Sequence, residues 1–389
     1  MTAAWMDIFF TLSSTCPRMF RSLTSMVNGE TQVLAVILDL DGTLLDTESA
    51  TRGILQEFLA KYGIQVDKER EANKRIGMTL KDSAASIVKD YDLQLTPDQF
   101  INEIMPIYHE KWKQVGPLPG ANRLIRHLYE QGVPFALASN SLQEYIDAKI
   151  SVQEGWKECF SVIVGSDQVK SGKPSPDIFI EAAKRLGIDA VHCLVIEDSM
   201  VGVKAAKSAK MKVVAIPSQK EADCSTLADS VLNSLLEFQP ELWDLPEFDD
   251  WIENALPIEP IYMNTLYRND SVHELTEDAA SSLPDQVSGV YFGWAVASAL
   301  ETFKVVVGIG WHLRSYTATR KIQICIIDGD CNHASDLEME LTLVGFIRGL
   351  NSTEITSVAV EIREEDKSIA SASLDLPMFI HHSCMASRL

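Results

Sequence analysis

The chain has 389 residues, of which 46% are hydrophobic and 23% charged, values typical of a globular protein with room for two domains. Its net charge of −21 at pH 7 argues against nucleic acid as a partner and makes binding of a phosphorylated substrate depend on local cations. No apolar run is long enough to span a bilayer, so we expect no membrane partner. The seven cysteines lack CxxC spacing, which favours a reducing compartment, and we predict a cytoplasmic protein.

Residues 1–32 differ in composition from the rest of the chain. They are rich in Ser and Thr, contain Arg18 and Arg21, and have few acidic residues. This composition fits a transit peptide for a plastid or mitochondrion, and equally a disordered extension or a wrongly assigned start. We therefore predict an extension over 1–32 that is either disordered or a targeting signal.

The first strand-like segment leads into two carboxylates. Six apolar residues, Val33 to Leu38, precede Asp39-Leu-Asp41-Gly42-Thr43. A short, uninterrupted apolar run predicts a strand buried on both faces of a parallel sheet, and ligands bind at the carboxyl ends of such strands. One carboxylate can attack or bind a metal and the other can move protons, while Gly42 lets backbone amides approach an anion. A DxD pair by itself would also fit a solvated turn.

Residues 49–116 predict a helical insertion. Apolar stripes indicate helices over 54–62, 80–91 and 97–112, and the last begins with a capping box from Thr96 to Gln99. A simple crossover between two buried strands needs only one helix, so we predict a cap over the strand ends. Residues between the cap helices either face the substrate or form a solvated turn: Lys74, Arg75, Gly77 and Met78.

From residue 117 to 235 the pattern alternates between strands and helices. Apolar strand-like runs cover 133–138, 161–165, 193–196 and 212–216, with helical patterns at 120–130, 177–186 and 201–209. Alternation of this kind predicts an α/β fold with a doubly wound parallel sheet.

Three loops of this region carry polar groups at strand ends. Ser139-Asn140-Ser141 offers hydroxyl and amide groups to phosphate oxygens, and Lys173 lies in a Gly- and Pro-rich loop just before a helix. Glu197 and Asp198 place two acids at a strand end, where a hard cation such as Mg²⁺ would offset their charge.

These segments, in this order, resemble the signatures of the haloacid dehalogenase-like (HAD) superfamily, most of whose members are Mg²⁺-dependent phosphatases. The resemblance implies that Asp39 is the nucleophile and Asp41 the general acid and base. It also implies that Lys173 neutralises charge and that phosphate is bound by Gly42, Thr43, Ser139, Asn140 and Lys173. The metal would be held by Asp39, the Asp41 carbonyl, Asp198 and Glu197, the last either as a ligand or just behind the ligands.

The second half has another character. Residues 236–261 are acidic and Pro-rich, which predicts a semi-rigid junction. Runs at 289–298, 302–310, 321–328 and 337–348 are rich in β-branched and aromatic residues and predict a small antiparallel sheet or β-barrel over 262–389, with a closing helix over 354–371.

The segments SGVYFGWA, VGIGWH and LVGFIRG, with EGWKECFSVIVGSD and GKPSPDIF upstream, resemble the plant bifunctional riboflavin kinase/FMN hydrolase family. That resemblance implies FMN as substrate. The kinase half departs from the family, since no glycine lies between Pro260 and Val287 and Gln323 stands where the catalytic glutamate is expected. We therefore predict a degenerate kinase-like domain kept for stability, flavin retention or dimerisation, although a splicing or gene-model error would also remove the ATP loop.

The function that we expect is Mg²⁺-dependent hydrolysis of FMN through an aspartyl-phosphate. The alternatives are another small sugar or polyol phosphate as substrate, a bifunctional enzyme with residual riboflavin kinase activity, and a flavin-binding or assembly role for the second domain. A phosphosugar mutase would carry the same motifs. Nothing in the sequence excludes a homodimer.

Overall fold

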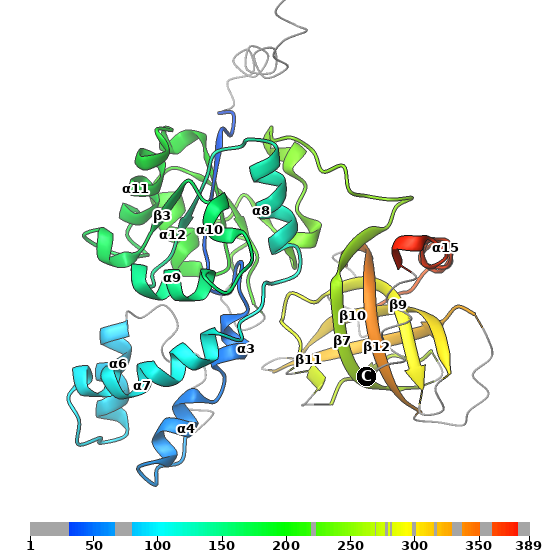
Figure 1. Cartoon of the computed structure of the whole chain (residues 1–389), viewed down its shortest axis with the longest axis horizontal. Coiled ribbons are helices and arrows are strands. Elements are labelled where there is room, and N and C mark those ends of the chain that lie inside the picture. The colour runs from blue at the N-terminus through cyan, green and yellow to red at the C-terminus, as the bar shows by residue number, and fades with distance from the viewer. Residues whose placement is uncertain are drawn as a thin grey trace, which may run out of the picture.

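The computed structural model describes residues 31–66, 80–218, 223–268, 270–276, 279–280, 282–297, 301–314, 317–328, 337–350 and 360–379. Two sheets organise these residues, one parallel and one antiparallel (Figure 1). Residues 1–30 of the predicted extension, together with Lys74, Arg75, Gly77 and Met78, lie outside the described part. Within the described part, every helix is too short or too polar to cross a bilayer.

The first sheet is parallel and has the strand order β3-β2-β1-β4-β5-β6. Its central strand is paired on both sides, since Val36 of β1 is in register with Phe135 of β2 and with Leu194 of β4. The chain first builds to one side of β1 and then crosses to the other, so the order reverses between β1 and β4, where α/β sheets bind ligands. The strands are β1 (Ala35–Leu38), β2 (Phe135–Ala138), β3 (Val162–Val164), β4 (Cys193–Glu197), β5 (Lys212–Ala215) and β6 (Ser230–Val231).

Helices cover both faces of this sheet, which is why its strands are apolar on both faces. Val36 and Leu38 pack in the core formed with α8 (Ala121–Glu130), α9 (Gln143–Ile150) and α10 (Trp156–Cys159). Ala35 and Ile37 face the opposite core, formed with α11 (Asp177–Leu186) and α12 (Met200–Ser208). The predicted doubly wound α/β fold is confirmed.

The cap consists of helices with a small core of their own. These are α3 (Thr47–Thr51), α4 (Ile54–Ala60), α6 (Leu80–Asp90) and α7 (Pro97–Trp112). Phe58 of α4 packs edge-on against Phe100 of α7, with ring centroids 5.0 Å apart. The capping box predicted at Thr96 and Gln99 is present. In Figure 1 these helices form a group beside the parallel sheet, joined to it through α3.

The second sheet is antiparallel, with the order β7-β12-β9-β10-β11-β8, and one helix packs on it. The predicted strands are present, although β10 and β11 extend further toward each other than the sequence indicated. The elements are β7 (Leu256–Tyr267), β8 (His273–Glu274), β9 (Gly289–Ala297), β10 (Thr302–Arg314), β11 (Thr317–Ile326), β12 (Leu337–Arg348) and α15 (Glu364–Leu374). The closing helix was predicted over 354–371, of which 354–359 lie outside the described residues; within the described part the helix begins at Glu364, and the Asp366 carboxylate accepts a hydrogen bond from the Arg363 amide.

The junction differs from the prediction. A semi-rigid connection was expected through residue 261, whereas β7 begins at Leu256 and includes Pro257 and Pro260. The Pro-rich composition predicted a junction here, but β7 accommodates its prolines because it is at the edge of the sheet, where a missing N–H is tolerated. Before β7 the chain forms two short 3₁₀ helices, η3 (Leu235–Glu237) and η4 (Pro240–Trp243).

Candidate active site

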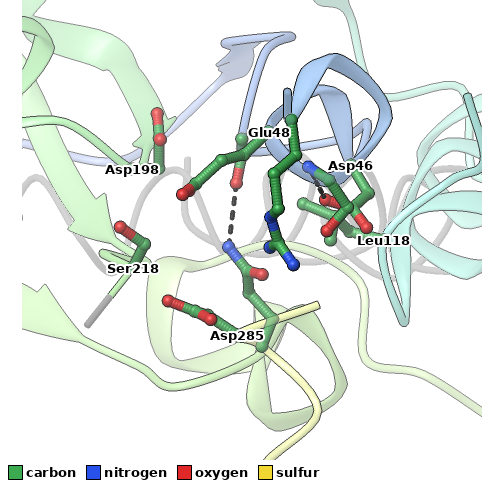
Figure 2. A pocket seen from close by; sticks show the side chains of 10 residues that line it. Asp46, Glu48, Leu118, Asp198, Ser218 and Asp285 are labelled. Carbon is green, nitrogen blue, oxygen red and sulfur yellow. Dashed lines mark hydrogen bonds between the residues drawn. The ribbon is translucent and has the colours of Figure 1, made fainter. Parts of the chain in front are cut away.

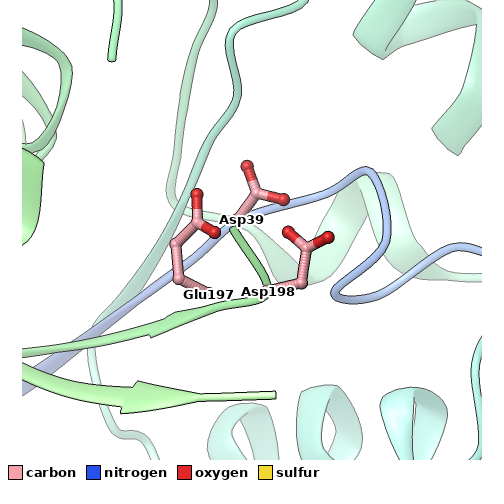
Figure 3. A group of neighbouring side chains, drawn as sticks. All are labelled: Asp39, Glu197 and Asp198. Atoms are coloured by element: carbon pink, nitrogen blue, oxygen red, sulfur yellow. The ribbon is translucent and has the colours of Figure 1, made fainter. Parts of the chain in front are cut away.

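Three carboxylates meet at the carboxyl ends of β1 and β4 (Figure 3). Asp39 follows β1, Glu197 is the last residue of β4, and Asp198 comes next. One carboxylate oxygen from each residue lies within 4.8 Å of the others. Because β1 and β4 are parallel neighbours, the same sheet edge presents all three side chains.

Gly42 makes room for Asp198. The glycine has φ of +86°, and a Cβ at this position would lie 2.2 Å from Oδ2 of Asp198. The neighbouring Thr43 donates its hydroxyl to Oδ1 of Asp198 over 3.3 Å. A side chain at position 42 would therefore both strain the turn and displace the carboxylate.

Lys173 is buried between two of the acids. Its side chain donates hydrogen bonds to Asp39 and, over 2.7 Å, to Oε1 of Glu197, and the residue is 5% exposed. The amide of Asn140 fixes the lysine backbone: its Oδ1 accepts from Lys173 N over 2.8 Å, and its Nδ2 donates to Lys173 O over 3.2 Å. Asn140, which the sequence suggested as a phosphate ligand, thus uses its side chain to hold Lys173.

The electrostatics of this group indicate an unbalanced negative charge. Burial raises the pKa of Asp39 to about 7, with Lys173 opposing the rise and Glu197 adding to it. Burial, together with Glu197 and Asp39, raises the pKa of Asp198 well above its usual range. Burial disfavours the Lys173 ammonium, but the two acids outweigh it and raise the pKa of the lysine. One ammonium thus faces three carboxylates, so a further cation would stabilise the ionised group.

Glu197 has little coordinating capacity left. Its Oε2 accepts hydrogen bonds from the amide of Ser199 at 2.6 Å and from the hydroxyl of Ser199 at 3.0 Å, while Oε1 accepts from Lys173. A Cβ on Gly202 would lie 1.7 Å from Oε1, so the start of α12 is packed directly on this carboxylate. Asp39 and Asp198 are therefore better placed than Glu197 to hold a cation directly.

Asp41 faces away from this group and pairs with Lys149. Its Oδ1 accepts from Lys149 Nζ over 2.6 Å, and its Oδ2 accepts from the hydroxyls of Ser141 at 2.9 Å and Ser139 at 3.2 Å. Burial alone would raise the pKa of Asp41, but Lys149 and the two serines lower it. The Ser139 hydroxyl, expected to bind phosphate, is thus directed at Asp41.

The sequence analysis missed Lys149. A lysine on a helix is usually exposed, yet Lys149 is 3% exposed and its Nζ lies 4.8 Å from the ring centroid of Trp112 on α7. A signal was present, since Ile146, Lys149 and Ile150 occupy one helical face at spacings of three and four residues. The lysine therefore belongs to the apolar face of α9.

A pocket lies beside Asp198, and residues of both the parallel-sheet and the antiparallel-sheet domain line it (Figure 2). The loop before β9 contributes two of its side chains, and Gln286 donates its amide to the carbonyl oxygen of Gly42 over 3.1 Å. No local sequence pattern indicates this contact, because 244 positions separate the two residues. The lining residues are Gly42, Asp46, Glu48, Ser49, Arg52, Leu118, Asp198, Ser218, Asp285 and Gln286.

Comparisons with known proteins agree with this architecture. Residues 36–216 match the family of haloacid dehalogenase-like hydrolases. Two Arabidopsis thaliana relatives are phosphatases by name. The chain is 34% identical over 251 residues to (DL)-glycerol-3-phosphatase 1, mitochondrial, covering 62% of this chain and 83% of the relative. It is 34% identical over 233 residues to (DL)-glycerol-3-phosphatase 2, covering 57% of this chain and 95% of the relative. The chain belongs to the haloacid dehalogenase-like hydrolases, and within them it is a phosphatase.

A third relative matches both domains. The chain is 45% identical over 357 residues to the bifunctional riboflavin kinase/FMN phosphatase of Arabidopsis thaliana. This alignment covers 88% of this chain and 94% of the relative. The resemblance predicted for the second half is therefore confirmed over almost the whole length of that protein.

Proposed function

We propose that this protein is a Mg²⁺-dependent phosphatase that hydrolyses FMN to riboflavin and phosphate through an aspartyl-phosphate on Asp39. The observation that carries the proposal is the group formed by buried Asp39, buried Lys173 and half-buried Asp198 at the reversal point of the sheet. Similarity across both domains to a relative named for FMN phosphatase supports the choice of substrate.

The residues fit a magnesium ion. All available donors are oxygens, as a hard cation prefers. Burial first, and then the neighbouring carboxylates, raise the pKa values of Asp39 and Asp198, and a cation would offset both effects. Asp39, Asp198 and the backbone carbonyl of Asp41 would hold the ion, with Glu197 behind them. When bound, Mg²⁺ stabilises negative charge on a phosphoryl oxygen and reduces the repulsion between substrate and nucleophile.

The reaction divides between two aspartates. Asp39 attacks phosphorus, and the bond from phosphorus to the 5′-oxygen of riboflavin breaks as the acyl-phosphate bond forms. Asp41 gives a proton to the leaving oxygen and then takes one from the water that hydrolyses the acyl-phosphate. Lys173 and the backbone amide of Thr43 stabilise charge on the remaining phosphoryl oxygens, whereas the Gly42 amide is hydrogen-bonded to Leu45 O and the Ser139 hydroxyl to Asp41. In the free enzyme Lys173 also favours the ionised, nucleophilic form of Asp39.

A direct assay tests this proposal. Purified full-length protein is incubated with Mg²⁺ and FMN, glycerol 3-phosphate or a hexose phosphate, and released phosphate is measured. We expect the highest kcat/KM with FMN and loss of turnover when EDTA removes the metal. Phosphate release from the polyol or sugar phosphates without release from FMN would overturn FMN as substrate while leaving the phosphatase class intact.

A polyol phosphate is the second candidate substrate, because two relatives at 34% identity are named glycerol-3-phosphatases. We do not extend the kinase activity of the bifunctional relative to this chain. Pro260 to Val287 contains no glycine, and Gln323 stands where a catalytic glutamate is expected. An amide cannot accept the riboflavin hydroxyl proton as a carboxylate does. FMN formed from riboflavin and ATP would contradict this view.

For the compartment we propose the cytoplasm. Four cysteines in the described part of the chain form no disulfide, and three of them are buried: Cys159, Cys193, Cys224 and Cys325. This usage fits a reducing environment. A fluorescent fusion to the full chain that localised to plastids or mitochondria would instead favour a targeting role for residues 1–32.

A further inference from the structure

The loop from Ser282 to Ser288 extends from the antiparallel domain to the phosphatase site. It is the last part of the connection between β8 and β9 and leads directly into β9. Gln286 is 6% exposed and donates to the Gly42 carbonyl, and Asp285 lines the same pocket as Asp198 (Figure 2). The loop thus contacts the turn that follows Asp39 and Asp41.

Arg320 of β11 fixes this loop from within its own domain. The guanidinium donates to the carbonyl oxygens of Ala280, Leu283 and Val287, at 3.1, 2.9 and 3.3 Å, and also to that of Pro284. The arginine is 2% exposed, and its guanidinium carbon lies 4.6 Å from the ring centroid of Trp311. A buried guanidinium that satisfies several carbonyls holds a loop in one conformation.

The two domains are also fixed relative to each other near the junction. Leu235 packs in a core of the parallel sheet, whereas the next residue, Leu236, packs in a core of the antiparallel sheet. Arg123 of α8 makes a bidentate ion pair with Asp250, at 2.6 and 2.7 Å, and its guanidinium carbon lies 3.5 Å from the ring centroid of Phe248. These contacts attach the junction that leads into β7 to the parallel-sheet domain.

We propose that the antiparallel domain completes the phosphatase site and that Gln286 is a positioning residue for the Leu40–Leu45 turn. The inference rests on the proposed phosphatase function. The turn closes on itself through Gly42 N to Leu45 O and through the amides of Leu44 and Leu45 to Leu40 O, each at 3.0 Å. The Gln286 amide donates to the Gly42 carbonyl and so limits rotation of the Gly42–Thr43 peptide. The second domain thereby acts in phosphate-ester hydrolysis, whether or not it binds flavin.

Two substitutions distinguish hydrogen-bond donation from packing. Gln286→Glu keeps the size of the side chain but removes the donor and sets a carboxylate against the Gly42 carbonyl and near Asp198. Gln286→Ala removes donor and bulk together. Ser282→Ala is the matched control, because this hydroxyl lies in the same loop and donates only to Ala279 O over 2.8 Å.

Hydrogen–deuterium exchange of the Leu40–Asp46 peptide, in the full chain without substrate, is the first measurement. We expect exchange to be about fivefold to tenfold faster in both Gln286 variants, the range for loss of one neutral hydrogen bond, and unchanged in Ser282→Ala. Unchanged exchange in the Gln286 variants, or protection kept in Gln286→Glu and lost only in Gln286→Ala, would overturn the proposal, since the second pattern is that of a packing role.

Kinetics with FMN and p-nitrophenyl phosphate form the second measurement. We expect kcat to fall by about fivefold to tenfold with both substrates in Gln286→Glu, with a smaller change in KM, because the turn is shared by all phosphate esters. A rise in KM for FMN alone, with kcat unchanged, would contradict a role in positioning the turn. If the wild type releases phosphate from p-nitrophenyl phosphate but not from FMN, the FMN proposal fails, while the exchange data still decide the role of Gln286.

Discussion

Lys149 Nζ lies 2.6 Å from Oδ1 of Asp41, and it joins the assigned acid–base residue to the cap. The lysine comes from α9 on the parallel sheet, and Trp112, over whose ring it lies, comes from the last turn of the cap helix α7. Trp112 in turn contacts Tyr145 of α9, with ring centroids 5.3 Å apart. A change in cap position would therefore alter the surroundings of the cation that holds Asp41.

Replacing Lys149 with Met should impair catalysis more than stability. Met keeps much of the apolar stem but leaves Asp41 without its cation, so we expect kcat to fall by about tenfold to hundredfold, within the range for disturbed acid–base catalysis. Because Lys149 lowers the pKa of Asp41, the limb of the pH–rate profile that is set by Asp41 should move to higher pH. Lys157→Met on the neighbouring helix α10 is the control, and an unchanged pH profile in Lys149→Met would contradict the assignment.

Asp39→Asn should abolish turnover without unfolding the protein. The amide cannot form an acyl-phosphate, so we expect a loss of at least about 10³-fold in kcat, as when a nucleophile is removed. Glu197 still pairs with Lys173 in this variant, so the lysine is not left buried alone. Phosphate release and a thermal melt monitored by circular dichroism check the two statements. A tenth of the wild-type rate would exclude Asp39 as the nucleophile.

The residues that the sequence located lie on the parallel sheet, and those that it missed come from contacts between elements. Asp39, Glu197 and Asp198 follow apolar runs whose strand ends must share one edge, so local pattern and topology were sufficient. Lys149 reaches Asp41 only because α9 packs on the parallel sheet against β1, and Gln286 reaches Gly42 only because two domains dock. No periodicity within one segment encodes either distance. The start of β7 could not be predicted from its Pro-rich sequence, because proline is compatible with a strand only where that strand is at the edge of a sheet.

Gly42 and Gly53 have similar backbone conformations, so alanine substitutions at the two positions distinguish the effect of backbone strain from the effect of a close side-chain contact. Gly42 has φ of +86° and lies against Asp198, whereas Gly53, with φ of +82°, has no atom within 4 Å of an added Cβ. Alanine at either position should cost about 1 kcal/mol of stability from the left-handed backbone. Only Gly42→Ala should also lose activity and require more Mg²⁺, because its methyl group displaces the Asp198 carboxylate. Equal kinetics for the two variants would mean that Asp198 does not need this space.

Glu237→Gln should stabilise the protein in a pH-dependent way. Glu237 lies on η3 between the two domains, where a Cβ on Gly349 would approach its side chain to 2.6 Å, and burial raises its pKa from 4.5 to about 7. Between these two values the unfolded chain has released the proton while the folded chain retains it. The free energy of unfolding therefore falls as pH rises through this window, by at most about 1.4 kcal/mol per pH unit, and the loss of stability remains at higher pH.

Glutamine never ionises, so the Tm of Glu237→Gln should exceed that of the wild type by a few degrees at pH 8 and by little near pH 4.5. The exposed Glu241→Gln on η4 is the control. An equal Tm difference at both pH values would show that Glu237 is ionised in the folded protein throughout this range.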